Sequence, residues 1–174
     1  TKKNGILVMP TGSGKSLVIA ALAKQLGGRI VVLQPSKEIL EQNMDKMHNF
    51  GFWNIGVFSA SCGRKDTGQI TFGTIGSVIT HKELFEKCQL VIVDECHAVN
   101  SKGGMYETFL NHLDLPTIGL SATPYRLRNY NDNKTGDHVA ESRILTRTRP
   151  RIFDKIIHIT QVKDLFEQGY LCPL

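Results

Sequence analysis

The four cysteines of this 174-residue chain show no paired spacing. No two of them stand in a C-x-x-C arrangement, which argues against a disulfide framework and against a structural zinc site. This cysteine usage favours a reducing compartment, and we expect the protein to be cytoplasmic. The cysteines are Cys62, Cys88, Cys96 and Cys172.

Long hydrophobic runs, internal repeats and low-complexity tracts are also lacking. The apolar runs at residues 6–9, 30–33 and 90–93 are far shorter than the about 20 residues that a membrane-spanning helix needs, so we expect no membrane partner. With 41% hydrophobic and 21% charged residues, the composition is that of an ordinary globular protein. The length suits one domain with a short extension, and two full domains would not fit.

Positive charge is in excess, because 21 lysines and arginines against 16 acids give a net charge of +5 and a pI of about 9.1. A polyanionic partner such as nucleic acid is therefore favoured. Part of the excess lies in a late stretch with little apolar periodicity. We interpret residues 126–152 as a long, solvated basic loop or insertion. The bases between residues 126 and 155 are Arg126, Arg128, Lys134, Arg143, Arg147, Arg149, Arg151 and Lys155.

Short apolar runs alternate with longer amphipathic stretches along the chain, which is typical of βαβ units. The short runs are hydrophobic at nearly every residue, as in a parallel sheet whose two faces are covered by helices. We therefore predict an α/β fold with a central, mostly parallel sheet and with ligands beyond the carboxyl ends of its strands. The expected strands lie at 5–9, 30–33, 55–58, 70–74, 89–93, 117–120 and 155–159, and the expected helices at 15–26, 37–49, 81–87, 104–113 and 161–168.

A glycine-rich loop follows the first expected strand and precedes an apolar helical stretch. Its glycines let successive backbone N–H groups converge on phosphate oxygens, and the helix start adds partial positive charge. Lys15 is expected to reach the β- and γ-phosphates, and the Ser16 hydroxyl to ligate magnesium. The strict phosphate-loop pattern has Gly in place of Met9, but the strand–loop–helix context makes a chance turn the weaker interpretation. The loop comprises Pro10, Thr11, Gly12, Ser13, Gly14, Lys15 and Ser16.

Two acids, Asp94 and Glu95, follow the apolar run 90–93. Carboxylates at the end of a buried strand are costly unless a cation or a reaction uses them. Asp94 can hold magnesium, and Glu95 can orient or deprotonate the water that attacks a γ-phosphate. The pair alone would equally suit a helix N-terminal cap, but together with the phosphate loop it predicts a nucleoside triphosphate site.

Two hydroxyl residues, Ser121 and Thr123, stand at the end of another expected strand, where local physics alone favours a simple turn closed by Pro124. However, the order of T-G-S-G-K-S, D-E-C-H and S-A-T-P resembles the DExH-box helicases of superfamily 2. The resemblance covers nearly the whole chain. It is to the group that includes proteins similar to XPB, UvsW and the helicase subunits of type I and type III restriction enzymes.

The resemblance implies a RecA-like P-loop NTPase domain that uses ATP and Mg²⁺ to move along or unwind nucleic acid, with DNA favoured over RNA. The phosphate loop and the acids would keep the roles given above. Ser121 and Thr123 would couple hydrolysis to movement, and His97 would link the γ-phosphate to that coupling segment.

Two further segments match positions of this family that contact nucleic acid. Residues 31–37 resemble motif Ia, and residues 70–77 resemble a later T-x-x-S segment. Backbone amides and short hydroxyls reach phosphate oxygens without reading base edges. Without the family, a strand end closed by polar turn residues would be an equally good interpretation. The candidate contacts are Gln34, Pro35, Ser36, Gly73, Thr74 and Ser77.

The resemblance also implies a division of the chain. Residues 1–125 would form the first RecA-like domain, 126–152 the basic loop, and 153–174 a final strand and helix that lead to the linker of a second lobe. In this family ATP lies between two lobes, and the second supplies an arginine finger, which contributes about 10³–10⁵ in rate in related chemistry. We therefore expect this chain alone to bind ATP and magnesium but to hydrolyse slowly.

Other interpretations remain open. The motor could serve a restriction system, or it could act on RNA, because D-E-C-H also occurs in RNA-directed helicases. A strand-binding module with a degenerate nucleotide site is disfavoured, because the phosphate-loop lysine and both acids are present.

Overall fold

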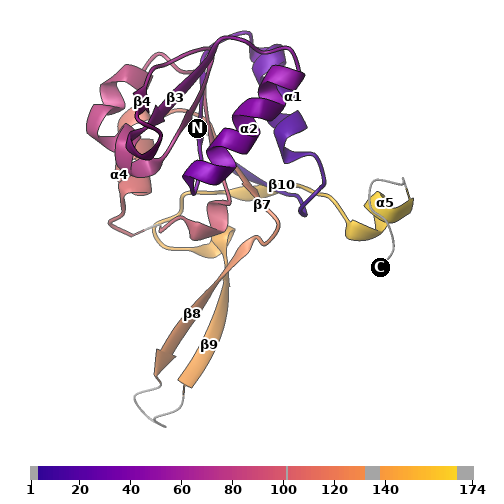
Figure 1. Cartoon of the computed structure of the whole chain (residues 1–174). Helices are drawn as coiled ribbons and strands as arrows, with labels where there is room; N and C mark the ends of the chain where they lie inside the picture. Colours follow the sequence, from indigo (N-terminus) through magenta and orange to yellow (C-terminus); the bar gives the residue numbers. More distant parts are fainter. Residues whose placement is uncertain (1–3, 101, 132–137, 168–174) are drawn as a thin grey trace.

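The main sheet of the computed structural model has eight strands in the order β10-β1-β7-β6-β2-β5-β3-β4 (Figure 1). The structure describes residues 4–100, 102–131 and 138–167. Neighbouring strands are parallel throughout, except that β3 and β4 are antiparallel. The strands are β1 (Gly5–Val8), β2 (Ile30–Leu33), β3 (Ile55–Ser59), β4 (Arg64–Lys65), β5 (Ile70–Gly73), β6 (Leu90–Asp94), β7 (Thr117–Ser121) and β10 (Lys155–Ile159).

Helices cover both faces of this sheet. Successive strand residues point to opposite sides and nearly all are apolar, so both faces must be shielded from water. In β2, Ile30 and Val32 pack with α1 and α2, while Val31 and Leu33 pack with the helices of the other face. Figure 1 shows α1 and α2 lying together on one side. The helices are α1 (Lys15–Leu26), α2 (Lys37–Asn49), α3 (Ile75–Val78), the 3-10 helix η2 (Ile79–Phe85), α4 (Met105–Leu113) and α5 (Val162–Glu167).

The predicted α/β class and sheet are confirmed, and each strand expected from the sequence lies within one residue of its predicted bounds. The helix expected at 81–87 differs. The chain turns into α3 directly after β5, where Ser77 and Val78 donate backbone N–H bonds to the Thr74 carbonyl, and it continues as η2 to Phe85. The helical segment therefore begins earlier than the apolar periodicity indicates, and most of it is a tighter 3-10 helix.

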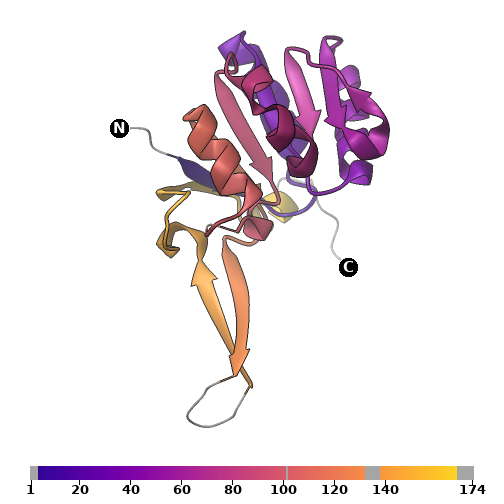
Figure 2. The same cartoon turned by 90° about the vertical axis from the view of Figure 1, so that its left-hand side faces the viewer.

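The expected loop at 126–152 is instead largely a β-hairpin. Strands β8 (Tyr125–Asn131) and β9 (His138–Ile144) pair in antiparallel register and project away from the sheet (Figures 1 and 2). The 3-10 helix η4 (Leu145–Arg147) follows, with Leu145 buried. The sequence pattern did not indicate these two strands, because Leu127 in this ribbon is 64% exposed and no buried face imposes the hydrophobic alternation of an ordinary strand.

At the end of the chain, α5 confirms the expected final helix through Glu167. The predicted linker, with Cys172, lies outside the described residues. None of the helices within the described ranges has both the length and the apolar character that crossing a bilayer requires.

Candidate functional site at the carboxyl edge of the sheet

The three sequence motifs meet because β1, β7 and β6 are neighbours in the sheet. Val8 pairs with Ser121, and Asp94 pairs with Leu120, so the carboxyl ends of the three strands lie side by side. The Met9 N–H also donates to the Ser121 carbonyl at 2.8 Å. Parallel pairing thus brings the phosphate loop, the acidic pair and the hydroxyl segment to one edge, as the sequence predicts.

The phosphate loop has the backbone conformation that anion binding requires. Gly12 and Gly14 have φ values of 81° and 87°, in the left-handed region that side chains disfavour. The first bond of α1 runs from Val18 N–H to the Gly14 carbonyl at 3.1 Å. The N–H groups of Lys15 and Ser16 precede that bond, so they have no acceptor within the helix and remain able to bind phosphate.

Lys15 and Glu95 join the first two motifs in an ion pair. Lys15 Nζ lies 2.6 Å from Glu95 Oε1, and the two side chains are 15% and 28% exposed. Glu95 has a φ of 49°, which is uncommon for a residue other than glycine and is often found where function requires strain. The left-handed turn follows β6 directly, where the chain ends the strand and carries the Glu95 carboxylate to Lys15.

Asp94 is a buried carboxylate, only 5% exposed, and its Oδ1 accepts the Glu95 N–H at 3.0 Å. Burial raises the pKa of Asp94 because desolvation penalises the charged form, while the positive charge of Lys15 opposes that rise. The amide of Gln34 also lies near enough to lower this pKa. Yet within the described residues neither amide atom of Gln34 meets hydrogen-bond geometry with any partner.

His97 connects Glu95 to the hydroxyl segment. His97 Nδ1 lies 2.9 Å from Ser121 Oγ and 3.2 Å from Glu95 Oε2. Ser121 Oγ donates its proton to the Thr123 carbonyl at 3.0 Å, so it accepts from His97, which places the imidazole proton on Nδ1. A continuous polar path therefore runs from the phosphate loop through both acidic and hydroxyl motifs.

Ser16 has a partner that sequence reasoning missed. Its hydroxyl donates to Asn43 Oδ1 on α2 at 2.7 Å, and both residues are buried. The available signal was the position of Asn43 between Leu40 and Met47, on the apolar face of α2. A buried amide on such a face requires a hydrogen-bond partner. Because the proton of Ser16 is directed at Asn43, the lone pairs of its oxygen are left for another ligand.

The donors at this edge fit magnesium when it is bound with a nucleotide. The Asp94 carboxylate and the Ser16 hydroxyl are hard oxygen ligands, and magnesium usually keeps several waters and takes the remaining ligands from phosphates. Across the described ranges, no group of three or more His, Cys, Asp or Glu side chains is placed to hold a metal ion. Protein atoms here would thus supply only part of a coordination shell.

Cys96 serves packing. Burial is the main reason why the pKa of its thiol rises to about 12, which makes the thiol unreactive. A Cβ added at Gly119 would lie 2.7 Å from Cys96 Sγ, so the two residues fit closely against each other.

The residues expected to contact nucleic acid fall into two groups. Pro35 is exposed, and Ser36 and Thr74 are half-buried, with the Ser36 hydroxyl capping α2 by accepting the Ile39 N–H at 3.4 Å. Gln34, Gly73 and Ser77 are instead buried, so the Gln34 and Ser77 side chains do not reach the surface in this structure.

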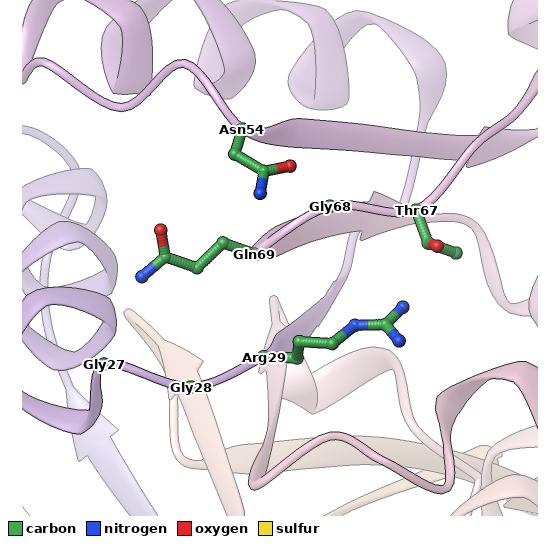
Figure 3. Close-up of a pocket in the computed structure, with 7 residues that line it drawn as sticks. All are labelled: Gly27, Gly28, Arg29, Asn54, Thr67, Gly68 and Gln69. Carbon is green, nitrogen blue, oxygen red and sulfur yellow. The ribbon is translucent and has the colours of Figure 1, made fainter.

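A cavity of about 520 Å³ lies at the opposite, amino edge of the sheet (Figure 3). Its walls come from the turns that precede β2, β3 and β5, and none of the sequence motifs reaches it. The lining residues are Gly27, Gly28, Arg29, Asn54, Thr67, Gly68 and Gln69.

The carboxyl edge has the arrangement of a RecA-like nucleotide-binding domain. Comparison with known proteins gives the same class. Residues 1–126 match the family model described as Type III restriction enzyme, res subunit. The chain is 30% identical over 140 residues to a 51.5 kDa protein of a Lactococcus phage, covering 77% of this chain and 27% of that protein. It is 29% identical over 127 residues to the DNA 3'-5' translocase XPB2 of Sulfurisphaera tokodaii, covering 72% and 28%.

Solved structures agree. The UvsW helicase from bacteriophage T4 matches with a TM-score of 0.61 and 25% identity, over 70% of this chain and 48% of that chain. The Hef helicase domain of Pyrococcus furiosus has a TM-score of 0.55 and 21% identity, over 71% and 30%, and shows the fold alone.

The chain therefore belongs to the family of the type III restriction enzyme res subunit, and it is a RecA-like motor domain of the superfamily 2 helicases. It spans 27% and 28% of the length of the two curated relatives named above. The resemblance seen in the motifs is confirmed.

Proposed function

We propose that this chain binds ATP with Mg²⁺ and acts as the first of two lobes of a DNA translocase or helicase. The ion pair between Lys15 and Glu95 is the observation that carries the proposal. Lys15, the cation that would bind the γ-phosphate, is paired with Glu95, the acid that would activate water. A phosphate arriving at Lys15 replaces the Glu95 carboxylate as its anion, and Glu95 becomes available to a water molecule.

Phosphate and metal binding then follow from the geometry of the loop. The amides around Gly12 and Gly14 would hold the phosphate oxygens, while Ser16 and Asp94 would hold Mg²⁺. Asp94, whose pKa is raised by burial, would be kept in its charged form by a divalent cation beside it. Magnesium would supply neutralisation of the charge that develops on the phosphates.

Coupling to movement is assigned to the path from Glu95 through His97 to Ser121. When Glu95 leaves Lys15, its contact with His97 Nδ1 changes, and His97 also donates to Ser121. The segment of Ser121 and Thr123 thereby senses the nucleotide. The second lobe would complete the site and supply further charge stabilisation.

DNA is the proposed track. The curated relative from Sulfurisphaera tokodaii is named a DNA 3'-5' translocase, and the net charge of +5 suits a polyanion. A role in a restriction system uses the same motor, since the matching family description is that of a restriction enzyme subunit. Exposed Pro35 and the half-buried hydroxyls of Ser36 and Thr74 are the proposed strand contacts.

Nucleotide binding tests the proposal directly. Lys15→Ala should weaken the binding of a fluorescent ATP analogue with Mg²⁺ by about 10- to 100-fold, because a charge-assisted contact contributes about 1.5–3 kcal/mol. Lys24→Ala, on the last turn of the same helix, is the matched control and should bind as the unaltered protein does. Equal affinity of the two variants would contradict the assignment. Stimulation of hydrolysis by single-stranded RNA but not DNA would reassign the track.

A further inference from the structure

The β8–β9 hairpin takes no part in the chemistry described so far. Its two strands pair with each other and with no strand of the main sheet. Tyr125, Leu127 and Ile144 on the hairpin are 43%, 64% and 38% exposed, so the ribbon adds little to the core of the lobe. A two-stranded hairpin is marginally stable in water by itself, so this one depends on its attachment to the lobe.

The base of the hairpin is attached to the nucleotide edge. Leu145 N–H donates to the Pro124 carbonyl at 2.9 Å, which closes the ribbon immediately after Thr123. Arg126 Nη1 donates to the Val99 carbonyl at 3.4 Å, just beyond the turn that carries His97. Figures 1 and 2 both show the ribbon extending outward from this edge. The arm is therefore anchored on the two segments that follow the acidic and hydroxyl motifs.

Positive charge gathers at this base. Arg126 and Arg143 are direct partners across the ladder, so their side chains lie on the same face, and both are exposed. Side chains directly opposite each other on one face of a ladder lie close enough to contact the same ligand. Guanidinium groups bind phosphate oxygens through paired N–H donors, which suits a nucleic-acid backbone. Three more exposed arginines follow the ribbon, at Arg147, Arg149 and Arg151.

We propose that the hairpin is a DNA-binding arm whose Arg126 and Arg143 bind the phosphates of a duplex. That the polyanion is nucleic acid rests on the proposed function. The duplex form rests on shape, because the major groove of B-form DNA, about 12 Å wide, admits a two-stranded β-ribbon. The deep, narrow groove of A-form RNA does not. The arm thus contacts the duplex ahead of or behind the DNA strand that Ser36 and Thr74 are proposed to bind.

The test measures binding of a fluorescein-labelled DNA duplex across a range of salt concentrations. Removing two phosphate contacts with the double substitution Arg126→Gln and Arg143→Gln should reduce the slope of log affinity against log salt by about 1.8. The control pair Arg29→Gln and Arg64→Gln removes the same charge elsewhere, at the amino edge and on β4, and should leave the slope unchanged. Equal slopes in the two double variants would overturn the proposal.

Two further measurements separate this inference from the proposed function. The charge-preserving pair Arg126→Lys and Arg143→Lys should retain the slope of the unaltered protein, and a loss there would contradict phosphate binding by charge. Binding of the ATP analogue should be the same in all these variants. If the protein binds ATP but no duplex, the proposed role of the hairpin is refuted and the nucleotide site is not. If it binds duplex through these arginines but binds no ATP, the proposed nucleotide site is refuted and the role of the hairpin is not.

Discussion

The two edges of the sheet both carry glycine-rich turns and polar side chains, but they differ in what is buried. At the carboxyl edge, the carboxylate Asp94 is only 5% exposed. At the amino edge, Asn54 and Thr67 around the cavity are exposed to solvent. A charged or polar group held away from water is costly and needs a reason, whereas an open polar hollow costs nothing. A buried charge therefore distinguishes the carboxyl edge from the amino edge.

The glycines of the two edges teach the same distinction. Gly14 has a positive φ, and a Cβ added there would meet nothing closer than Leu17 Cβ at 3.8 Å. A Cβ at Gly68 would lie 2.6 Å from the Asn54 carbonyl oxygen, and one at Gly28 would lie 2.3 Å from Gln89 Cδ. Gly14 thus leaves backbone amides accessible, whereas Gly28 and Gly68 permit close packing.

The largest expected difference between the edges concerns hydrolysis. Glu95→Gln should lower the single-turnover rate of ATP hydrolysis by about 10²–10⁴, because the carboxylate proposed to activate water is lost, while ATP binding persists. Arg29→Gln, beside the cavity, should leave the rate unchanged. An equal loss in both variants would erase the distinction between the edges.

A smaller effect is expected at Asn43, which supports the proposed magnesium ligand Ser16. Asn43→Ala removes the acceptor of the Ser16 hydroxyl, and the freed hydroxyl no longer points its lone pairs at the metal. Such supporting contacts contribute about 10- to 100-fold in metal affinity. Titration of Mg²⁺ in the presence of the ATP analogue measures this, with Asn49→Ala at the exposed end of α2 as control. If the magnesium dependence of Asn43→Ala is unchanged, Asn43 is not needed to orient the Ser16 hydroxyl.

Because the amino edge is closely packed, a substitution there is expected to lower stability without weakening ATP binding. Gly68→Ala should lower the free energy of unfolding by about 1–3 kcal/mol, because its Cβ meets backbone atoms that cannot move aside. Gly76→Ala, where a Cβ meets nothing within 4 Å, should be neutral or slightly stabilising. Urea denaturation compares them, and an intact Gly68→Ala protein with weakened ATP binding would assign this edge to the site after all.

The smallest expected effect is the pH dependence of stability in the absence of nucleotide. Burial raises the pKa of Asp94 above the model-peptide value of 3.8 that applies to the unfolded chain. The folded state therefore binds the extra proton, and ionisation of Asp94 costs stability as the pH rises through the raised pKa. Asp94→Asn should be more stable than the unaltered protein at neutral pH, with an advantage that disappears below the unfolded pKa. Thermal unfolding in EDTA measures both, and a pH-independent difference would exclude this cause.

Much of this molecule could be predicted from its sequence, because parallel strands buried on both faces leave continuous apolar runs such as Ile30–Leu33. The motifs were placed because each directly follows such a run. Asn43 was missed because its partner, Ser16, is 27 residues away and only packing of α1 against α2 brings them together. The hairpin was missed because a ribbon that is solvated at Leu127 needs no hydrophobic pattern.

The contact between Lys15 and Glu95 also determines what a binding measurement on this lobe reports. A nucleotide that binds at Lys15 exchanges one anion for another, since an internal carboxylate already lies 2.6 Å from Nζ. The observed affinity is consequently a difference between two competing anions rather than the full strength of the phosphate contact. Glu95→Gln removes this internal competitor. The variant that is expected to hydrolyse ATP more slowly than the unaltered protein should therefore also bind ATP more tightly.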